Sequence, residues 1–360
     1  MELALGIPGA IRLEIGDPDF TTPAHIIDAA AASAREGFTH YGPSVGLASL
    51  RALIAEKVIA TNGFACTPDD VVVSSGACGG LHATLLALLD PGDELLVPDP
   101  GWTTYIPMSV SAGVVPVRYR LDRTRDFALD LEAIEQAIGP RTRAIVVNSP
   151  SNPTGNVATR EELDQVCELA ERHDLWLISD ECYEDMVFEG EHVSPASRGD
   201  PGRVVSAFSF SKSYAMTGWR VGYIVAGNGV AQLIAKSQEP IVSSPSTISQ
   251  KAAEGALRGP QDCIAEFRNA YRRRRDAALE LLDAADVSYA RPSGAFYLMV
   301  DVSAGGSDDE FAMRLLRERH VAVVPGSAFG EGGAGMVRVT LAAADEAIAT
   351  GLARLCDLLG

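Results

Sequence analysis

The feature that most constrains the fold is an alternation, along residues 45–285, of short β-branched apolar runs with segments of helical periodicity. Strand-length runs occur at residues 71–74, 94–97, 114–119, 144–148, 175–179, 204–209 and 221–226. Helical periodicity occurs at residues 47–60, 80–89, 131–138, 160–173, 248–257 and 264–284. Strands that alternate with helices form a parallel sheet covered on both faces. We therefore expect an α/β fold with a mostly parallel sheet of seven strands, sandwiched by helices.

The pattern changes after residue 286, where a Pro-Ser-Gly turn at residues 292–294 is followed by shorter elements. Strands are expected at residues 295–300, 321–324 and 336–341, and helices at residues 309–318 and 345–359. This mixture predicts a smaller α+β domain, and a length of 360 residues suits two domains. We expect residues 45–285 to form the large domain, and residues 1–44 and 286–360 to form the small one.

The charge balance argues against polyanionic partners. The chain has 30 Lys and Arg against 48 Asp and Glu, a formal net charge of −18, which repels nucleic acids and anionic membranes. No apolar stretch has the roughly 18 residues of a membrane span. The chain start lacks a secretory pattern and the 6 cysteines form no Cys-x-x-Cys pair, so we expect a cytoplasmic protein with reduced thiols. The 6 histidines lack ligand spacing, so no metal site is predicted.

One lysine stands apart from the other three. Lys57, Lys236 and Lys251 lie in amphipathic helical stretches, where an ammonium group is ordinarily a solvated surface charge. Lys212 instead follows the apolar run at residues 204–209, with hydroxyl residues on both sides. The carboxyl ends of parallel strands border the crevice in which open α/β sheets bind ligands. This position suits a lysine that forms a Schiff base.

Seven segments, in this order along the chain, carry a family resemblance: GDPDFTTP (16–23), YGPSVGLASLR (41–51), DPGDELLVPDPGW (90–102), NSPSNPTG (148–155), SDECYEDM (179–186), SFSKSYAMTGWR (209–220) and VRVTLA (337–342). With them the chain resembles the class I/II aminotransferases, which have fold type I and depend on pyridoxal 5′-phosphate (PLP). The resemblance covers nearly the whole chain. It implies a fold type I transferase that moves an amino group between an α-amino acid and a 2-oxo acid by a ping-pong mechanism.

The resemblance also implies catalytic residues. Lys212 matches the lysine that forms the aldimine with PLP and then acts as general base. PLP withdraws electrons only while its pyridine nitrogen is protonated, and Asp180 matches the carboxylate that faces this nitrogen. Asn152 and Tyr183 match the donors to the 3′ oxygen of the ring. Taken without the family, these three residues would more often be a helix cap, a turn residue and a packing aromatic.

A second group of residues matches the phosphate site. The turn Gly76-Ala77-Cys78 opens a helix, whose free backbone N–H groups and dipole favour an anion. Ser209, Ser211 and Arg220 match further phosphate ligands, and the arginine can bind two oxygens at once. Related chains often have Ser or Thr where this chain has Cys78. That difference removes a hydroxyl and leaves the backbone donors in place.

The remaining matches concern the ring, the substrate and the subunit interface. Trp102 matches the aromatic residue that stacks on the cofactor ring. Arg338 matches the arginine that clamps the substrate α-carboxylate, because a planar fork fixes its orientation. Gly16 and Asn152 match contacts near the substrate. Tyr41 matches a tyrosine that reaches the cofactor phosphate of the neighbouring subunit, which implies a homodimer with shared active sites.

The same residues are compatible with functions other than amino-group transfer. A PLP-dependent elimination, replacement or cyclisation enzyme would use the same cofactor site, and the 15 residues before Gly16 favour a roomier substrate side than in related chains. A PLP-sensing transcription regulator would need a basic DNA-binding segment, which the charge of −18 disfavours. The expected substrate-side residues Phe20, Tyr41 and Phe296 favour a neutral or aromatic amino donor.

Overall fold

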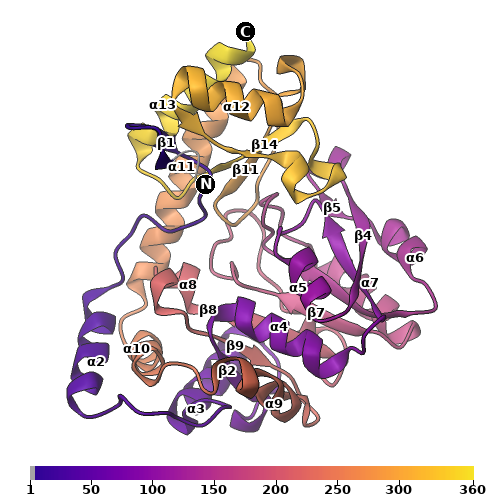
Figure 1. Cartoon of the computed structure of the whole chain (residues 1–360), viewed down its shortest axis with the longest axis vertical. Helices are drawn as coiled ribbons and strands as arrows, with labels where there is room; N and C mark the ends of the chain where they lie inside the picture. The colour runs from indigo at the N-terminus through magenta and orange to yellow at the C-terminus, as the bar shows by residue number, and fades with distance from the viewer. Residues whose placement is uncertain (1–4) are drawn as a thin grey trace.

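The structure is a computed structural model that describes residues 5–360. Residues 1–4, which belong to the segment assigned to the small domain from sequence, lie outside the described residues. Figure 1 shows a larger part that contains the central sheet and a smaller part formed by the C-terminal segment. The helix α11 (Asp262–Ala284) extends from the larger part to the smaller one.

The central sheet has eight strands in the order β2-β9-β8-β7-β6-β3-β4-β5. Strand β9 is antiparallel to both of its neighbours, β5 is antiparallel to β4, and the other neighbouring pairs are parallel. The bounds are β2 (Val71–Ser74), β3 (Glu94–Asp99), β4 (Val115–Asp122), β5 (Ala128–Leu129), β6 (Thr142–Asn148), β7 (Trp176–Asp180), β8 (Val204–Ser209) and β9 (Gly222–Val225). The mostly parallel sheet is confirmed. The predicted count of seven strands was one too low, because the two-residue β5 is too short to give a periodic signal.

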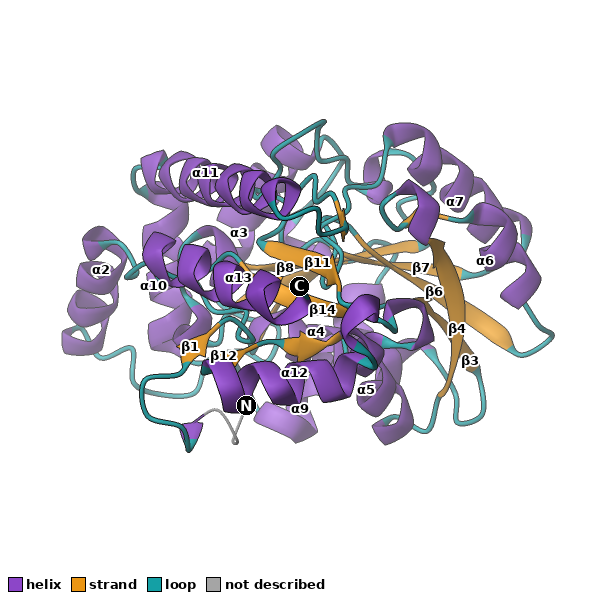
Figure 2. Ribbon diagram, turned by 90° about the horizontal axis from the view of Figure 1, so that it is seen from above, coloured by secondary structure: helices purple, strands orange, loops and turns teal. Residues whose placement is uncertain are grey.

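Helices cover both faces of this sheet (Figure 2). One face packs against α3 (Ala48–Lys57), α6 (Leu131–Ala137), α7 (Arg160–Arg172) and α10 (Thr247–Arg258). The other face packs against α4 (Gly76–Leu88), α5 (Tyr105–Ser111) and α9 (Val230–Val242). Helices α5, α9 and α2 (Ala24–Arg35) were not predicted from the sequence. Proline lies inside both α5 and α9, and α2 is rich in alanine.

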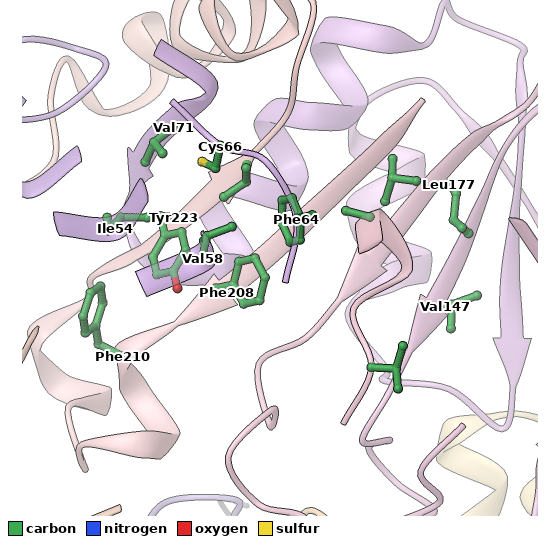
Figure 3. Close-up of a cluster of buried hydrophobic side chains, with 14 of the residues drawn as sticks. Ile54, Val58, Phe64, Cys66, Val71, Val147, Leu177, Phe208, Phe210 and Tyr223 are labelled. Atoms are coloured by element: carbon green, nitrogen blue, oxygen red, sulfur yellow. The ribbon is translucent and has the colours of Figure 1, made fainter. Parts of the chain in front are cut away.

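The strands divide their side chains between two cores. Val71 and Val73 of β2 belong to the core on the α3 side, whereas Val72 between them belongs to the core on the α4 side. Figure 3 shows the first of these cores, in which Ile54 and Val58 pack beside Phe208 and other strand residues. Because both faces are buried, the strands appear in the sequence as continuous apolar runs.

The smaller part is built on a second, antiparallel sheet of order β10-β11-β14-β13. Its elements are β10 (Tyr289–Ala290), β11 (Tyr297–Asp301), α12 (Asp308–Arg319), β13 (Val324–Pro325), β14 (Met336–Thr340) and α13 (Asp345–Leu359). The strand β1 (Ile11–Arg12) pairs in parallel with β12 (Val321–Ala322) beside this sheet (Figure 2). Helix α2 lies instead beside α10 of the larger part (Figure 1). The N-terminal segment therefore contacts both parts.

Two features of this fold position a site. The parallel strands β6, β7 and β8 end at Asn148, Asp180 and Ser209, so their carboxyl ends lie at the same edge of the sheet. Helix α4 begins after β2 at Gly76. Over residues 5–360, none of the helices is both long enough and apolar enough to cross a membrane.

Candidate active site

A cavity of about 470 Å³ lies between the carboxyl edge of the large sheet and the small sheet. Sequence-predicted site residues from both parts and from the N-terminal segment line it: Gly16, Gly76, Ala77, Cys78, Trp102, Asn152, Asp180, Tyr183, Ser209, Ser211, Lys212, Arg220 and Arg338. Tyr41, which was predicted to reach the cofactor of a neighbouring subunit, does not line it, and this side chain is 89% exposed. The fold thus brings together residues that are more than 300 positions apart in sequence.

Lys212 lies in α8 (Phe210–Ser213), the short helix that follows β8. Its Nζ donates to the carbonyl oxygen of Gly16 at 2.6 Å, and it lies 5.5 Å from the ring centre of Phe296. Burial lowers the pKa of Lys212 to about 8. About a tenth of this amine is therefore neutral at pH 7, far more than for an ordinary lysine, and the neutral form is the one that a nucleophile or a general base requires.

Asp180 is the last residue of β7 and is 4% exposed. The hydroxyl of Tyr105 donates to its Oδ2 at 2.7 Å, and the backbone N–H of Cys182 donates to its Oδ1 at 3.3 Å. Burial raises the pKa of Asp180, while these hydrogen bonds act in the opposite direction because they stabilise the carboxylate. Tyr105 was not identified from the sequence.

Two tyrosines and an asparagine complete the wall beside Lys212. The Tyr183 hydroxyl lies 2.8 Å from that of Tyr297, so one donates to the other. The backbone N–H of Asn152 donates to Oδ1 of Asn148 at 2.8 Å, which fixes the turn after β6. Asn152 Oδ1 in turn accepts from Arg338.

The start of α4 lines one end of the cavity. Gly76 has φ +71°, and a Cβ at this position would lie 2.6 Å from Nη2 of Arg220, so the close approach requires glycine. The first N–H groups of a helix have no partner within it. Ser211 and the guanidinium of Arg220, which donates to the carbonyl of Thr217 at 2.9 Å, line the same end.

Arg338 lies in β14 and is 7% exposed. Nη1 donates to Asn152 Oδ1 at 2.8 Å, and Nη2 donates to the carbonyl oxygen of Glu14 at 2.7 Å. Its Nε is buried without a hydrogen-bond partner, and burial lowers the pKa of Arg338. A buried guanidinium with a free donor is matched by an anion such as a carboxylate.

Several residues that line the cavity were not predicted from the sequence, and two residues predicted on the substrate side are absent from its lining. Asp17, which accepts from the Thr217 hydroxyl at 2.6 Å, lines the cavity, as do Thr103, Asn148, Cys182, Tyr297, Val324 and Phe329. Phe20 and Phe296 were expected on the substrate side and are absent from the lining of this cavity. Phe20 stacks on Phe267 with ring centres 4.2 Å apart, and Phe296 is fully buried. Phe296 lies inside the apolar core, whereas Phe20 is half-buried and packs against the edge of that core.

The comparisons with known proteins agree with this geometry. The family model described as aminotransferase class I and II matches residues 8–355. The chain belongs to the class I and II aminotransferases. It is 41% identical to an aspartate/prephenate aminotransferase of Thermus thermophilus, over 97% of this chain and 91% of that protein. It is 42% identical to an arginine–pyruvate transaminase of Pseudomonas aeruginosa, with the same two coverages of 97% and 91%.

A solved structure places this aminotransferase in the fold type I group. The Thermus thermophilus aspartate aminotransferase with maleate superposes with a TM-score of 0.95 and 39% identity, over 99% of this chain and 94% of that chain. The expected family, fold class and transaminase activity are thereby confirmed. The family uses PLP. Among residues 5–360, the aminotransferase has no cluster of three or more His, Cys, Asp or Glu suited to a metal ion.

Proposed function

We propose that this aminotransferase holds PLP in the cavity, joined to Nζ of Lys212, and moves amino groups between an α-amino acid and a 2-oxo acid. The observation that carries the proposal is the common cavity of Lys212, Asp180 and Arg338. These three side chains supply a neutral amine, a buried carboxylate and a carboxylate-binding fork. Each has a distinct function in amino-group transfer.

The residues present fit the cofactor at each of its ends. The helix start at Gly76 and the side chains of Ser209, Ser211 and Arg220 would hold the phosphate. Asp180 would hold the pyridine nitrogen in its protonated form, since a buried carboxylate is stabilised by a nearby positive charge. The same cavity is lined by Trp102, Asn152 and Tyr183, which would hold the ring and its 3′ oxygen.

PLP, when bound, supplies an electron sink that acidifies the α-carbon of an attached amino acid. An amino acid that replaced Nζ on the cofactor would release the Lys212 amine, and its unprotonated form would then accept the proton that leaves this carbon. The pKa of about 8 makes this form more abundant near neutral pH than for an ordinary lysine. The Gly16 carbonyl holds Nζ in place at 2.6 Å.

Arg338 would orient the substrate through its α-carboxylate. Two of its five N–H groups are used by Asn152 and Glu14, which leaves the Nε–H and one N–H on each terminal nitrogen. A planar fork fixed in this way binds the carboxylate in one orientation. The α-carbon of a bound amino acid is thereby directed toward Lys212.

We propose a neutral or aromatic side chain for the amino donor. The cationic residues of the lining are Lys212, Arg220 and Arg338, and each already has a function. The substrate side also offers apolar surface from Val324 and Phe329. A side-chain carboxylate would therefore lack a cationic partner from this chain, and its uncompensated desolvation would disfavour binding.

We further propose a cytoplasmic homodimer with shared sites, in which Tyr41 reaches the phosphate of the partner. Its exposed ring, outside the cavity of its own chain, supports this. We also retain the division into residues 45–285 against residues 1–44 and 286–360. Sedimentation velocity at micromolar concentration should give a dimer, and a Tyr41→Ala variant should bind PLP more weakly. A monomer with full activity would overturn the dimer.

The main test is to trap the imine chemically. PLP-loaded protein is reduced with borohydride and digested, and the modified peptide should contain Lys212. A Lys212→Ala variant should show no label, whereas Lys236→Ala, which removes a helix α9 lysine, should be labelled normally. A label on another lysine, or a wild-type protein that stays colourless, would contradict the proposal.

A spectral panel tests the reaction and the donor class. Amino acids that act as donors should convert the loaded enzyme to its pyridoxamine form, and a 2-oxo acid should reverse this. Initial rates at several fixed acceptor concentrations should then give parallel lines. Release of ammonia or thiol without a recovered 2-oxo acid would support the elimination or replacement alternative, and intersecting lines without a half-reaction would contradict transamination.

A further inference from the structure

Tyr297, the first residue of β11, contacts both groups of residues that the proposed function separates. Its side chain is 2% exposed. Its hydroxyl lies 2.8 Å from that of Tyr183, which faces the cofactor side. Its ring centre lies 4.4 Å from the guanidinium carbon of Arg338, which faces the substrate side. A Cβ on Gly16 would collide with the same hydroxyl, so this group also packs against the N-terminal segment.

The register of the small sheet explains why Tyr297 and Arg338 meet. Tyr297 pairs with Thr340 across β11 and β14, and Met299 pairs with Arg338. Residues two apart on a strand share a face, so Tyr297 and Arg338 are diagonal neighbours on the same side of the sheet. Diagonal neighbours are within reach when both side chains are long, as here. The contact is therefore fixed by strand pairing.

The hydroxyl of Tyr297 determines the direction of the Tyr183 proton. The Tyr183 ring is held edge-on to Phe296, with ring centres 5.3 Å apart, so the rotation of its O–H is the freedom that remains. A phenol that donates to a cofactor oxygen still accepts one hydrogen bond. Either hydroxyl can donate in this pair, so when Tyr183 donates to the cofactor oxygen, Tyr297 becomes the donor to Tyr183. Hydrogen bonds in series strengthen one another.

The ring of Tyr297 determines the plane of the Arg338 fork. The guanidinium lies close to two aromatic rings, with the Tyr297 ring centre 4.4 Å and the Phe329 ring centre 4.8 Å from its central carbon. Its two hydrogen bonds, to Asn152 Oδ1 and to the Glu14 carbonyl, hold Nη1 and Nη2 in place. The two rings prevent the plane from tilting, and a cation over a desolvated ring face is itself stabilised.

We propose that Tyr297 is a positioning residue with two separable functions: its hydroxyl orients the Tyr183 hydroxyl toward the ring oxygen of the cofactor, and its ring orients the Arg338 fork toward the substrate carboxylate. This inference rests on the proposed function. The effect on the cofactor then depends on the hydroxyl oxygen of Tyr297, and the effect on the substrate depends on the face of its ring. Two substitutions at this position therefore separate the functions.

The first variant is Tyr297→Phe, which removes the hydroxyl and keeps the ring. We expect the pKa of the visible absorbance of the PLP-loaded enzyme to rise by about half a unit, the size of one neutral hydrogen bond. Weaker donation to the ring oxygen favours the protonated imine. The dissociation constant for propanoate, a carboxylate probe, should stay within about twofold of the wild type.

The second variant is Tyr297→Leu, which removes the ring as well. We expect propanoate to bind about tenfold more weakly, because the fork loses one of its two aromatic faces. Matched controls are Tyr271→Phe and Tyr271→Leu. Tyr271 is fully buried in the same aromatic cluster, 5.0 Å from Phe296, and its hydroxyl has no partner. Neither control should change the spectral pKa or propanoate binding.

The outcomes distinguish this inference from the proposed function. A wild-type protein that never turns yellow with PLP overturns both. If the wild type is yellow but the visible absorbance of Tyr297→Phe has the same pKa as that of the wild type, the Tyr297 hydroxyl does not orient the Tyr183 hydroxyl. If Tyr297→Leu melts cooperatively and binds propanoate like the wild type, the ring has none. A Tyr297→Leu protein that does not fold leaves the Tyr297→Phe titration to decide, and an unshifted titration then overturns the inference.

Discussion

The hydroxyl of Tyr105 donates to Oδ2 of Asp180 at 2.7 Å, and both side chains are buried. The two residues lie 75 positions apart, one in α5 and the other at the end of β7. Burial raises the pKa of this carboxyl, and the Tyr105 hydrogen bond opposes that rise. The bond therefore helps to keep a negative charge at a position where burial disfavours it.

Tyr105→Phe should lower kcat and raise the pKa of Asp180. A hydrogen bond to a charged group contributes about 1.5–3 kcal/mol, so we expect a ten- to hundredfold loss in the half-reaction rate. Stopped-flow absorbance of the PLP-loaded enzyme, mixed with an amino acid donor, measures the rate of this half-reaction. Tyr119→Phe is the control, because Tyr119 is equally buried and donates to the Val146 carbonyl at 2.8 Å, away from Asp180. Equal losses in both variants would show a general packing effect.

Gly76→Ala should weaken PLP binding by about tenfold or more. At φ +71° an L-residue costs about 1–2 kcal/mol, and its Cβ would also displace Arg220. Gly79→Ala, in the first turns of the same helix, meets only ordinary contact with Ser75 at 3.5 Å and should bind PLP normally. Equilibrium dialysis of the two apoproteins provides the comparison. Comparable affinities would contradict the phosphate site.

The reaction of the apoprotein with pyridoxal should have the pH dependence of a lysine whose pKa is about 8. The neutral fraction of an amine rises about tenfold per pH unit below its pKa and levels off above it. Colour formation should therefore accelerate up to about pH 8 and then become constant. A rate that continues to rise toward the ordinary lysine value of 10.5 would show that burial does not perturb Lys212.

His192→Gln should cost more stability at pH 6 than at pH 9. Burial opposes protonation of His192, but its contact with Glu181 at 2.9 Å and the charge of Glu184 outweigh burial and Lys57, so its pKa is raised. A raised pKa gives stability that is complete below the ordinary value of 6.5 and is lost as the pH rises through the folded value.

Urea unfolding at the two pH values should show a difference of about 1 kcal/mol for His192→Gln. His173→Gln is the control, because His173 is exposed and lies 3.6 Å from the exposed Glu135. Its cost should be small at both pH values. A His192→Gln cost that is independent of pH would show that folding does not raise the pKa of His192.

Much of the fold was predictable because the relevant signals are local. The strand that ends at Asp180 and the strand that precedes Lys212 are mainly apolar runs that end in polar residues, and buried parallel strands have this pattern. Helix α9 was missed because Pro240 lies inside it and interrupts the periodic pattern. The strand β5 was missed because two residues carry no periodicity.

The predicted site residues had local motifs, whereas the missed ones act at long range. Tyr105 meets Asp180 only when α5 packs beside β7, and Tyr297 meets Tyr183 across 114 positions. In the sequence both are aromatic residues in apolar surroundings, where packing is the usual function. Phe20 and Phe296 have the same local appearance and are indeed packing residues. Only tertiary structure separates these two cases.

The pairing of β1 with β12 couples the position of the smaller part to the position of Lys212. The chain leaves this pairing at Arg12 and reaches Gly16 four residues later, where the carbonyl meets Nζ of Lys212. Because the segment between Arg12 and Gly16 is so short, a displacement of the smaller part would also move the Gly16 carbonyl that contacts Nζ of Lys212. The position of the Lys212 amine is in this way linked mechanically to the smaller part, which also contains Arg338.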